Sequence, residues 1–314
     1  MAPVRRFNSF GEYAKARFGG RKLQKVNIDA GFTCPNRDGT LGLGGCVYCN
    51  NNSFKPGTCR SVLPVSKQVS EGIGYLGRRY KAGLFLAYFQ PYTNTYAPVE
   101  ELERLYLEAL AHPQVAGLAI GTRPDCVDEQ KIALLERLAA KKYFILVEYG
   151  LQSVYEKSLQ FIERGHGFDA FLKALELTCG KGIHIGAHII AGIPTETREE
   201  TLLMADRLSE LDIGFLKLHQ LQVVKGTKLA RSYEQDPFHV FGYEEYIDFA
   251  VDFLERLRAD IVIQRLFATA PDELLIAPRW GWDRHRTLKD IETRLAQRNT
   301  FQGRKAKTVK QSMI

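Results

Sequence analysis

The sequence has little of what marks membrane-spanning, secreted or disulfide-stabilised proteins. Its 314 residues include only six cysteines, three methionines and two tryptophans. So few cysteines, unevenly spaced, exclude a disulfide scaffold and favour metal or redox chemistry. The most apolar windows, such as residues 183–193, are about 11 residues long and interrupted by histidines, whereas a transmembrane helix needs roughly 20 apolar residues. The first residues also lack the apolar stretch of a signal peptide, so we expect a cytoplasmic protein without membrane contact.

The charge of the chain is concentrated at its ends. Hydrophobic residues make up 45% of the sequence and charged residues 25%, which excludes a wholly disordered protein. The formal charge is +7, from 43 basic and 36 acidic residues. Residues 1–30 hold seven basic and two acidic side chains, residues 279–314 hold ten and three, and residues 31–278 hold 26 and 31. The sequence therefore excludes a uniformly basic protein and indicates two basic ends on a mildly acidic body.

Short apolar runs alternate with amphipathic helical patterns through most of the chain. The expected strands cover residues 26–30, 84–90, 115–122, 143–153, 183–194 and 214–224. Between them, residues 99–112 and 128–141 place their apolar side chains on one helical face. This alternation is typical of a buried parallel sheet. We predict an α/β fold, a partial (β/α)6 TIM-like barrel, with an open doubly wound sheet as the alternative.

The pattern changes after residue 225. A helix over residues 242–259 leads to two short strands, 261–266 and 273–278, and a final helix covers 286–298. We therefore expect a small C-terminal α/β extension. The predicted division is a basic N-terminal segment (1–25), a barrel core (26–225) and an extension with a basic helix and tail (226–314).

Polar side chains gather where the predicted strands end. In parallel α/β folds, chemistry is expected at the carboxyl ends of the strands, where loops converge on a rigid scaffold. The residues at these ends are Gln90, Asn94, Thr122, Arg123, Asp125, Glu148, Gln152, His188, Lys217, His219, Gln220 and Gln222. Each alone is ordinary strand-to-loop polarity, but their recurrence on successive strands predicts a polar pocket.

Three cysteines follow the first predicted strand. Eleven residues separate Cys34 from Cys46, and two separate Cys46 from Cys49. Thiolates are soft, anionic ligands, and three of them suit an iron-sulfur cluster that keeps one iron open. A zinc site would need a fourth ligand, for which Cys59 or His112 could serve. The glycine-rich stretch before the CxxC pair and the aromatic residue within it favour the cluster.

The segment around these cysteines resembles the radical S-adenosylmethionine (SAM) superfamily, in which a cysteine triplet in the first strand-to-helix loop binds a 4Fe-4S cluster. The usual spacing there is three residues and then two, but GFTCPNRDGT with GGCVYC is similar to the YhcC/YtqA group, which is related to the radical SAM domain of the elongator catalytic subunit. Further similar stretches follow in order at residues 88–98, 121–126, 147–166 and 188–197, and near the end as LLIAPRW and FQGR. The resemblance covers nearly the whole chain.

This resemblance implies a cofactor set and its ligands. Cys34, Cys46 and Cys49 would hold one 4Fe-4S cluster, whose open iron chelates SAM. Reduction by a donor such as flavodoxin or ferredoxin would cleave SAM to a 5′-deoxyadenosyl radical that abstracts hydrogen from the substrate. Tyr48 would lie against the adenine, where a flat ring offers stacking.

Further SAM contacts follow from similarity to oxygen-independent coproporphyrinogen oxidases. In GLQSVYEKSLQFIERGH, Gln152 would contact the ribose and Arg164 the carboxylate. His188 stands where those oxidases carry an acidic ribose ligand, and is either a hydrogen-bonding contact or a core histidine. Gln90 and Asn94 stand in the segment that usually binds the SAM amino group, without its usual glutamate.

The remaining cysteines predict a single cluster. Cys59, Cys126 and Cys179 form no second CxxC pair, and a buried free cysteine is common, so we expect structural roles for them. This weighs against methylthiolation, which uses an additional cluster in this superfamily.

The relatives of this group imply a tRNA substrate, with a wobble-uridine side chain as the modified group. The basic C-terminal end is compatible with RNA, because phosphates favour basic side chains and unstacked bases favour aromatic faces. Its residues are Arg284, Arg286, Lys289, Arg294, Arg298, Arg304, Lys305, Lys307 and Lys310, with Trp280, Trp282 and Phe301 between them. A solvated helix with a frayed tail is the other interpretation. A zinc-stabilised RNA-binding protein without catalysis, and radical chemistry on a small metabolite or a protein, remain as alternative functions.

Overall fold

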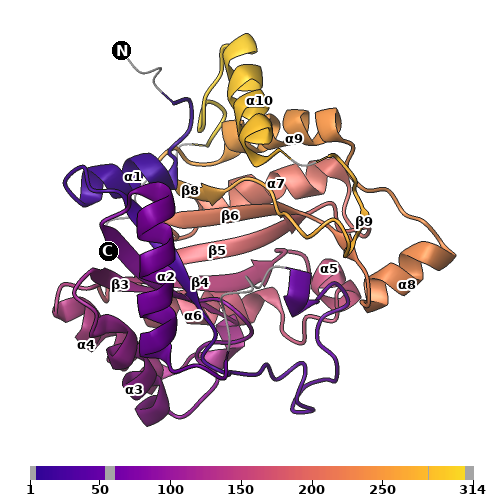
Figure 1. Cartoon of the computed structure of the whole chain (residues 1–314). Helices are drawn as coiled ribbons and strands as arrows, with labels where there is room; N and C mark the ends of the chain where they lie inside the picture. The colour runs from indigo at the N-terminus through magenta and orange to yellow at the C-terminus, as the bar shows by residue number, and fades with distance from the viewer. Residues whose placement is uncertain (1–4, 54–60, 282, 308–314) are drawn as a thin grey trace.

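The computed structural model describes residues 5–53, 61–281 and 283–307. Within them, seven parallel strands form one curled half-barrel in the order β1-β2-β3-β4-β5-β6-β8 (Figure 1). These strands are β1 (Leu23–Ile28), β2 (Leu84–Phe89), β3 (Val115–Thr122), β4 (Phe144–Gln152), β5 (His184–Ala191), β6 (Phe215–Gln220) and β8 (Val262–Arg265). Two short strands, β7 (Val223–Val224) and β9 (Leu275–Ala277), pair antiparallel in a separate sheet.

Helices connect the strands and cover the outer face of the half-barrel (Figure 1). They are α1 (Phe10–Arg17), α2 (Val65–Tyr80), α3 (Val99–Leu110), α4 (Glu129–Ala140), α5 (Glu156–Phe161), α6 (Phe168–Thr178), α7 (Arg198–Ser209), α8 (Lys228–Gln235), α9 (Tyr243–Arg256) and α10 (Arg284–Gln297), with single 3-10 turns at Asn51–Ser53 and Pro124–Cys126. Across the described residues, no helix combines the length and apolar character needed to cross a bilayer.

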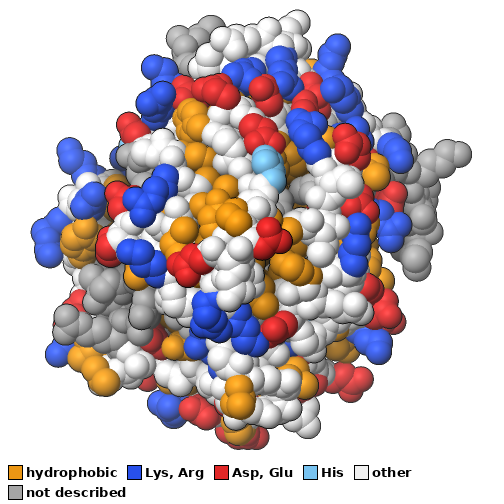
Figure 2. Space-filling view, turned by 90° about the vertical axis from the view of Figure 1, so that its right-hand side faces the viewer, with side chains coloured by type: hydrophobic (Ala, Val, Ile, Leu, Met, Phe, Trp, Pro, Cys, Tyr) orange, Lys and Arg blue, Asp and Glu red, His pale blue; other side chains and the backbone are white. Residues whose placement is uncertain are grey.

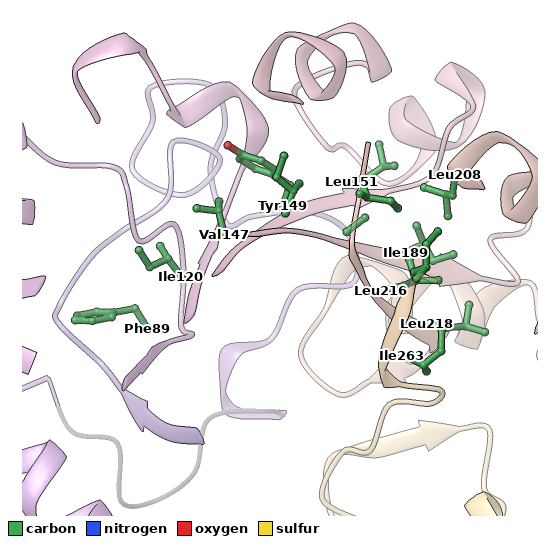
Figure 3. Packing of buried hydrophobic residues seen from close by; sticks show 14 of the residues in the cluster. Phe89, Ile120, Val147, Tyr149, Leu151, Ile189, Leu208, Leu216, Leu218 and Ile263 are labelled. Carbon is green, nitrogen blue, oxygen red and sulfur yellow. The ribbon is translucent and has the colours of Figure 1, made fainter. Parts of the chain in front are cut away.

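The outward-facing strand residues build the main core. Successive residues of a strand face opposite sides of the sheet. In β4, Val147, Tyr149 and Leu151 face the helices, and Figure 3 shows them in one buried cluster with Ile189 of β5 and Leu208 of α7. Because this face is mainly apolar, the chemistry of the half-barrel depends on the residues that face inward.

The inward-facing residues form an apolar layer below a polar one. The lower layer contains Leu86, Phe144, Leu146, Phe215 and Val262, and is covered by Phe10, Tyr13 and Phe18 of the α1 region. The rings of Tyr13 and Phe215 meet edge to face with centroids 5.1 Å apart. The polar layer lies nearer the carboxyl ends of the strands. Its inward-facing residues are Lys25, Tyr88, Glu148, His188 and Lys217. Aromatic packing therefore closes the amino end, and the polar layer faces the other end.

The predicted fold class is confirmed, with one strand more in the sheet. The six predicted strands are present, although the first begins at Leu23 and the run 214–224 breaks into β6 and β7. The sequence places the strand predicted at 261–266 in the C-terminal extension. In the structure this strand is β8, and it joins the main sheet by pairing with β6. An unpaired β6 would leave a row of backbone groups unsatisfied, which β8 covers. The division at residues 25 and 225 stays a prediction.

The basic helix α10 packs on α9 through ion pairs. Arg294 lies 2.8 Å from Glu244 and also pairs with Asp248, and Arg298 lies 2.7 Å from Asp252. Figure 2 shows basic and acidic side chains next to one another along the upper edge of the molecule. The acidic neighbour therefore offsets much of the positive charge that the sequence places on α10.

The aromatic residues near α10 have separate roles. The indole N–H of Trp280 donates to the Phe241 carbonyl at 2.8 Å, and its ring packs 5.0 Å from that of Tyr246. Trp280 is therefore a packing residue and not a face for RNA bases. Trp282 and Lys310 lie outside the described residues.

Candidate active site

The loop after β1 carries the three cysteines at the carboxyl end of the sheet. The Arg37 N–H donates to the Cys34 carbonyl at 2.7 Å, and the Gly45 N–H donates to the Asn36 carbonyl at 2.8 Å. Gly45 has a φ of +93°, and a Cβ there would lie 3.0 Å from Arg37 Nε. Only glycine meets both conditions without strain. The turn folds the eleven-residue gap back on itself, so that Cys46 returns toward the start of the loop.

A second segment, at residues 159–165, holds this loop from the other side. Asn36 Nδ2 donates to the carbonyl oxygens of Glu163 at 2.7 Å and Arg164 at 3.1 Å. The Val47 N–H donates to the Ile162 carbonyl at 3.1 Å. The similarity noted at residues 147–166 therefore includes the backbone support of the cysteine loop.

Hydrogen-bond donors surround two of the cysteine sulfurs. Arg164 Nη1 and Asn36 Nδ2 each lie 3.5 Å from Cys46 Sγ, and Arg37 Nη2 lies 3.6 Å from Cys49 Sγ. Burial raises the pKa of the Cys46 thiol, but the charge of Arg164 and the donated hydrogen bonds outweigh burial and lower that pKa. Burial and the neighbouring thiols raise the pKa of Cys49 despite Arg37. The surroundings of Cys46 therefore favour its thiolate, which carries the negative charge that a metal ligand needs.

Arg164 and Gln152 meet at an irregular point of β4. The buried Arg164 guanidinium donates twice to the Gly150 carbonyl, at 2.7 and 3.2 Å. A Cβ at Gly150 would lie 2.8 Å from Arg164 Nη2 and 2.9 Å from Gln152 Nε2. Gln152 itself has a φ of +74°, a strained value for a residue with a side chain. Such strain concentrates at functional sites, and here it turns Gln152 toward the strand ends.

The cysteines open into one cavity of about 240 Å³, several times the roughly 30 Å³ that one water occupies. The predicted ligand and cofactor residues on its wall are Cys34, Cys46, Cys49, Tyr48, Gln90, Gln152, Arg164 and His188. The other strand-end residues on the wall are Thr122, Arg123, Glu148, Lys217, His219, Gln220 and Gln222. The structure therefore confirms the predicted polar pocket.

Two strand-end residues do not reach this wall. Asn94 is fully buried, and its Nδ2 donates to the Gly121 carbonyl at 2.8 Å. Asp125 accepts two hydrogen bonds from the Arg123 guanidinium, at 2.9 and 2.7 Å. Both side chains contact residues of the wall from behind, and the SAM contact predicted for Asn94 stays a prediction.

Glu148 is the centre of a buried ionic network. Its carboxylate lies 2.7 Å from Lys25 Nζ, 2.5 Å from Lys217 Nζ and 3.2 Å from His188 Nε2. Lys217 also donates to the Tyr88 hydroxyl at 2.7 Å. Burial would raise the pKa of Glu148, but the charges of Lys217 and Lys25 outweigh burial and hold that pKa well below its usual range. Burial and the charge of Lys217 lower the pKa of His188 to about 4, so a neutral His188 donates its Nε2 proton to the carboxylate.

Two family models match the chain in succession. Residues 34–208 match the radical SAM superfamily, and residues 213–297 match the radical SAM C-terminal domain. The chain belongs to the radical SAM superfamily. The first match begins at Cys34 and runs through β5, so it includes all three cysteines and the Arg164 segment. The domain is that of a radical SAM enzyme.

Curated relatives place this radical SAM chain in the YhcC/YtqA group. YtqA of Bacillus subtilis is 32% identical over 96% of this chain and 92% of its own length, and YhcC of Escherichia coli K12 is 33% identical over 91% of each. The tRNA uridine(34) acetyltransferase of Methanocaldococcus jannaschii is 29% identical over 48% of this chain and 27% of its own length. The solved structure of Elp3 from Methanocaldococcus infernus has the same fold, with a TM-score of 0.68 at 16% identity, over 89% of this chain and 64% of that chain.

The zinc interpretation loses one of its two candidate ligands. His112 precedes β3, and therefore lies at the amino end of the sheet, opposite the cysteine loop. Its Nδ1 accepts a hydrogen bond from the Gln114 N–H at 3.2 Å. Cys59, the other candidate, lies outside the described residues. Over the described part of the chain, no three histidine, cysteine, aspartate or glutamate side chains are grouped to hold a single metal ion.

Several residues in contact with this site have no clear signal in the sequence. Asn36 and Arg37 stand between the cysteines, but their contacts with sulfur depend on how the loop folds. Lys25 and Tyr88 lie within strands, and Arg265 ends a strand that was assigned to the extension. For Lys25 a signal was available. It directly precedes Val26, which faces outward, and alternation along a strand therefore predicts that Lys25 faces the inside of the half-barrel.

We expect Gly150→Ala to weaken SAM binding by about 10-fold or more. The new Cβ forces Arg164 and Gln152 away from their present positions, and supporting contacts of this kind are worth about 10- to 100-fold. Equilibrium dialysis with radiolabelled SAM measures the effect. Gly83→Ala is the matched control, since a Cβ there meets nothing within 4 Å. Unchanged SAM affinity in Gly150→Ala would contradict the assignment of both residues.

Proposed function

We propose that Cys34, Cys46 and Cys49 hold a 4Fe-4S cluster that this enzyme uses together with SAM. The main support is that three cysteines share one cavity wall, with guanidinium and amide donors at the sulfurs of Cys46 and Cys49. Positive charge and hydrogen bonds at the sulfurs stabilise an anionic cluster and tune its potential. When bound, the cluster supplies the electron that cleaves the SAM sulfonium and begins radical chemistry on the substrate. An external one-electron donor, a flavodoxin or ferredoxin, belongs to this proposal.

The residues of the cavity wall would bind and orient SAM. Arg164 is buried, planar and permanently charged, which suits a bidentate contact with the SAM carboxylate. Gln152 offers an amide to the ribose hydroxyls, and the Tyr48 ring offers a flat face to the adenine. Gln90 also lines the cavity and would contact the amino group of SAM. His188 donates its Nε2 proton to Glu148, so its other ring nitrogen is left to accept a hydrogen bond from a hydroxyl.

For the substrate, we propose a modified tRNA base, namely the side chain of a wobble uridine. The support is the similarity of nearly half of this chain to a tRNA uridine(34) acetyltransferase. Mass spectrometry of tRNA nucleosides from deletion and wild-type cells tests this, and we expect one wobble nucleoside to be lost and its precursor to accumulate. Identical nucleosides in the two strains would remove tRNA and leave a small metabolite or a protein as the substrate.

The surface left for RNA is smaller than the basic C-terminal sequence suggests. Lys305 pairs with Glu255 of α9, as the α10 arginines pair with their acidic neighbours. Phe301 remains 45% exposed, and the Arg304 guanidinium lies 5.6 Å from its ring centroid. An exposed ring beside a guanidinium suits an unstacked base with its phosphate, and Lys307 is exposed nearby in the sequence.

We expect the double variant Arg304→Gln, Lys307→Gln to bind tRNA more weakly and with less salt dependence. Two lost phosphate contacts lower the slope of log K against log salt by about 1.4 to 1.8. Filter binding from low to moderate salt measures this slope. The matched control is Lys141→Gln, Lys142→Gln, which removes two exposed charges at the amino end of β4. Equal slopes in the two double variants would exclude this surface as the RNA contact.

A further inference from the structure

The cavity has two cationic ends. At the cysteine end, Arg37 and Arg164 lie against the sulfurs. The negative charge of the proposed cluster and of the SAM carboxylate would compensate these two guanidinium groups. At the other end, formed by β6 and β8, Lys217 and Arg265 line the wall. We refer to this second region, with His219 and Gln222, as the Lys217 end. The proposed cofactors leave it without a ligand.

Positive charge exceeds negative charge in the network at the Lys217 end. Lys25 and Lys217 share a single carboxylate, that of Glu148, at 2.7 and 2.5 Å. Burial lowers the pKa of both lysines, the carboxylate of Glu148 opposes this, and the positive charge of Arg265 lowers both pKa values a little further. Lys217 is only 5% exposed, so water does little to stabilise its ammonium group. Burying a cation is costly unless an anion compensates it, and here two ammonium groups have one carboxylate between them.

Hydrogen-bonding nitrogens at the same end lack partners. The Nε2 atoms of His219 and Gln222 are buried and make no hydrogen bond to the described part of the chain, and both residues line the cavity. The His219 ring lies beside that of His188, with centroids 5.8 Å apart. Unsatisfied buried polar atoms are uncommon in folded proteins. Gln222 Nε2 is a donor, and His219 Nε2 is a donor in the tautomer that carries its proton there, so a ligand acceptor at this wall would satisfy both.

We propose that the Lys217 end binds an anionic group of the substrate, a carboxylate or a phosphate, through Lys217 and His219. The inference rests on the proposed function, because the cluster and SAM occupy the cysteine end. A charge-assisted hydrogen bond from Lys217 and a second from His219 fix the position of such a group. Glu148 is then a positioning residue, since its contact with Lys217 fixes where the ammonium group lies. A neutral or cationic group would leave the excess positive charge uncompensated, so the substrate class is acidic.

Thermal unfolding of the iron-reconstituted holoenzyme tests this inference, with sodium acetate and inorganic phosphate as probes and sodium chloride at equal ionic strength as reference. A ligand of the folded state raises Tm by mass action, so we expect an increase of about 2 °C at several times the Kd. Lys217→Gln and His219→Phe should abolish it. Both should fold, because the first keeps the Lys25–Glu148 pair and the second removes an unpartnered nitrogen. The control Lys141→Gln removes an exposed cation at the amino end of β4, outside the cavity wall, and should keep the shift.

The two probes identify the kind of anion. A shift with acetate alone assigns a carboxylate, a shift with phosphate alone assigns a phosphate, and a shift with both assigns a general anion site. No shift with either probe, or an equal shift in both Lys217-end variants, overturns the inference. A shift that saturating SAM removes also overturns it, because the probe would then occupy the site of the SAM carboxylate. Iron content and SAM binding, measured on the same samples, report failure of the proposed function separately.

Discussion

Glu148→Gln is expected to lower the free energy of unfolding by about 3–5 kcal/mol, the usual cost of removing one partner from a buried ionic network. The substitution leaves the ammonium groups of Lys25 and Lys217 without their carboxylate. Urea denaturation at neutral pH measures the change, provided that the m-value is unchanged. The control is Glu136→Gln, which breaks a surface pair with Lys181 at 3.2 Å and should cost less than about 1 kcal/mol. Equal costs for the two substitutions would show that Glu148 does not hold the network together.

The same carboxylate predicts a dependence of stability on pH. The pKa of Glu148 in the folded state lies well below the value of 4.5 expected when the chain is unfolded, because Lys217 and Lys25 outweigh the effect of burial. Its contribution is therefore fully present above about pH 4.5 and is lost as the pH falls toward the folded-state pKa. Acid titration of wild type and Glu148→Gln should show their stabilities converging below that pH.

Cys46→Ala is expected to abolish cluster absorbance and the formation of 5′-deoxyadenosine. Loss of a ligand should cost more than the roughly 10- to 100-fold of a lost supporting contact, so no product should be detected. Anaerobic reconstitution followed by absorbance at visible wavelengths and chromatography of the products measures both effects. Arg164 would then lose the sulfur that lies 3.5 Å from its guanidinium, but its two bonds to the Gly150 carbonyl should keep the fold intact.

Cys179→Ala is the control for this experiment. Cys179 directly follows α6 and packs against the main core, and it does not line the described cavity. The variant should keep its iron and its activity. Cys126 is also away from that wall, and burial raises the pKa of its thiol to about 12, which fits an inert structural cysteine. Loss of iron in Cys179→Ala as large as in Cys46→Ala would refute the assignment of ligands by position on the wall.

The strand-end residues could be predicted because a parallel sheet brings its carboxyl ends together whatever the order of the strands. Gln90, Gln152 and His188 come from three different strands and still line one cavity. Asn94 shows where that argument stops, since it lies beyond the strand end and folds under the wall toward Gly121. Position after a strand predicts the neighbourhood of a side chain, whereas its direction depends on loop contacts.

The charged groups were harder to predict because their effects depend on partners distant in sequence. Arg294 counts as one positive charge in the sequence, but α9 brings Glu244 and Asp248 against it. Glu148 was expected only as a polar strand end, and its importance comes from Lys25, 123 residues earlier in the chain. Net charge therefore described the ends of the chain correctly but did not predict which charges remain exposed for a partner.

The central claim is that three cysteines hold a cluster with which this enzyme cleaves SAM. Anaerobically reconstituted protein, given a reductant and SAM, tests it most directly when 5′-deoxyadenosine and bound metal are measured in the same sample. We predict about four iron atoms per chain, consistent with one 4Fe-4S cluster on three thiolates, together with 5′-deoxyadenosine that depends on the reductant. Stoichiometric zinc without iron, and no 5′-deoxyadenosine, would contradict the account.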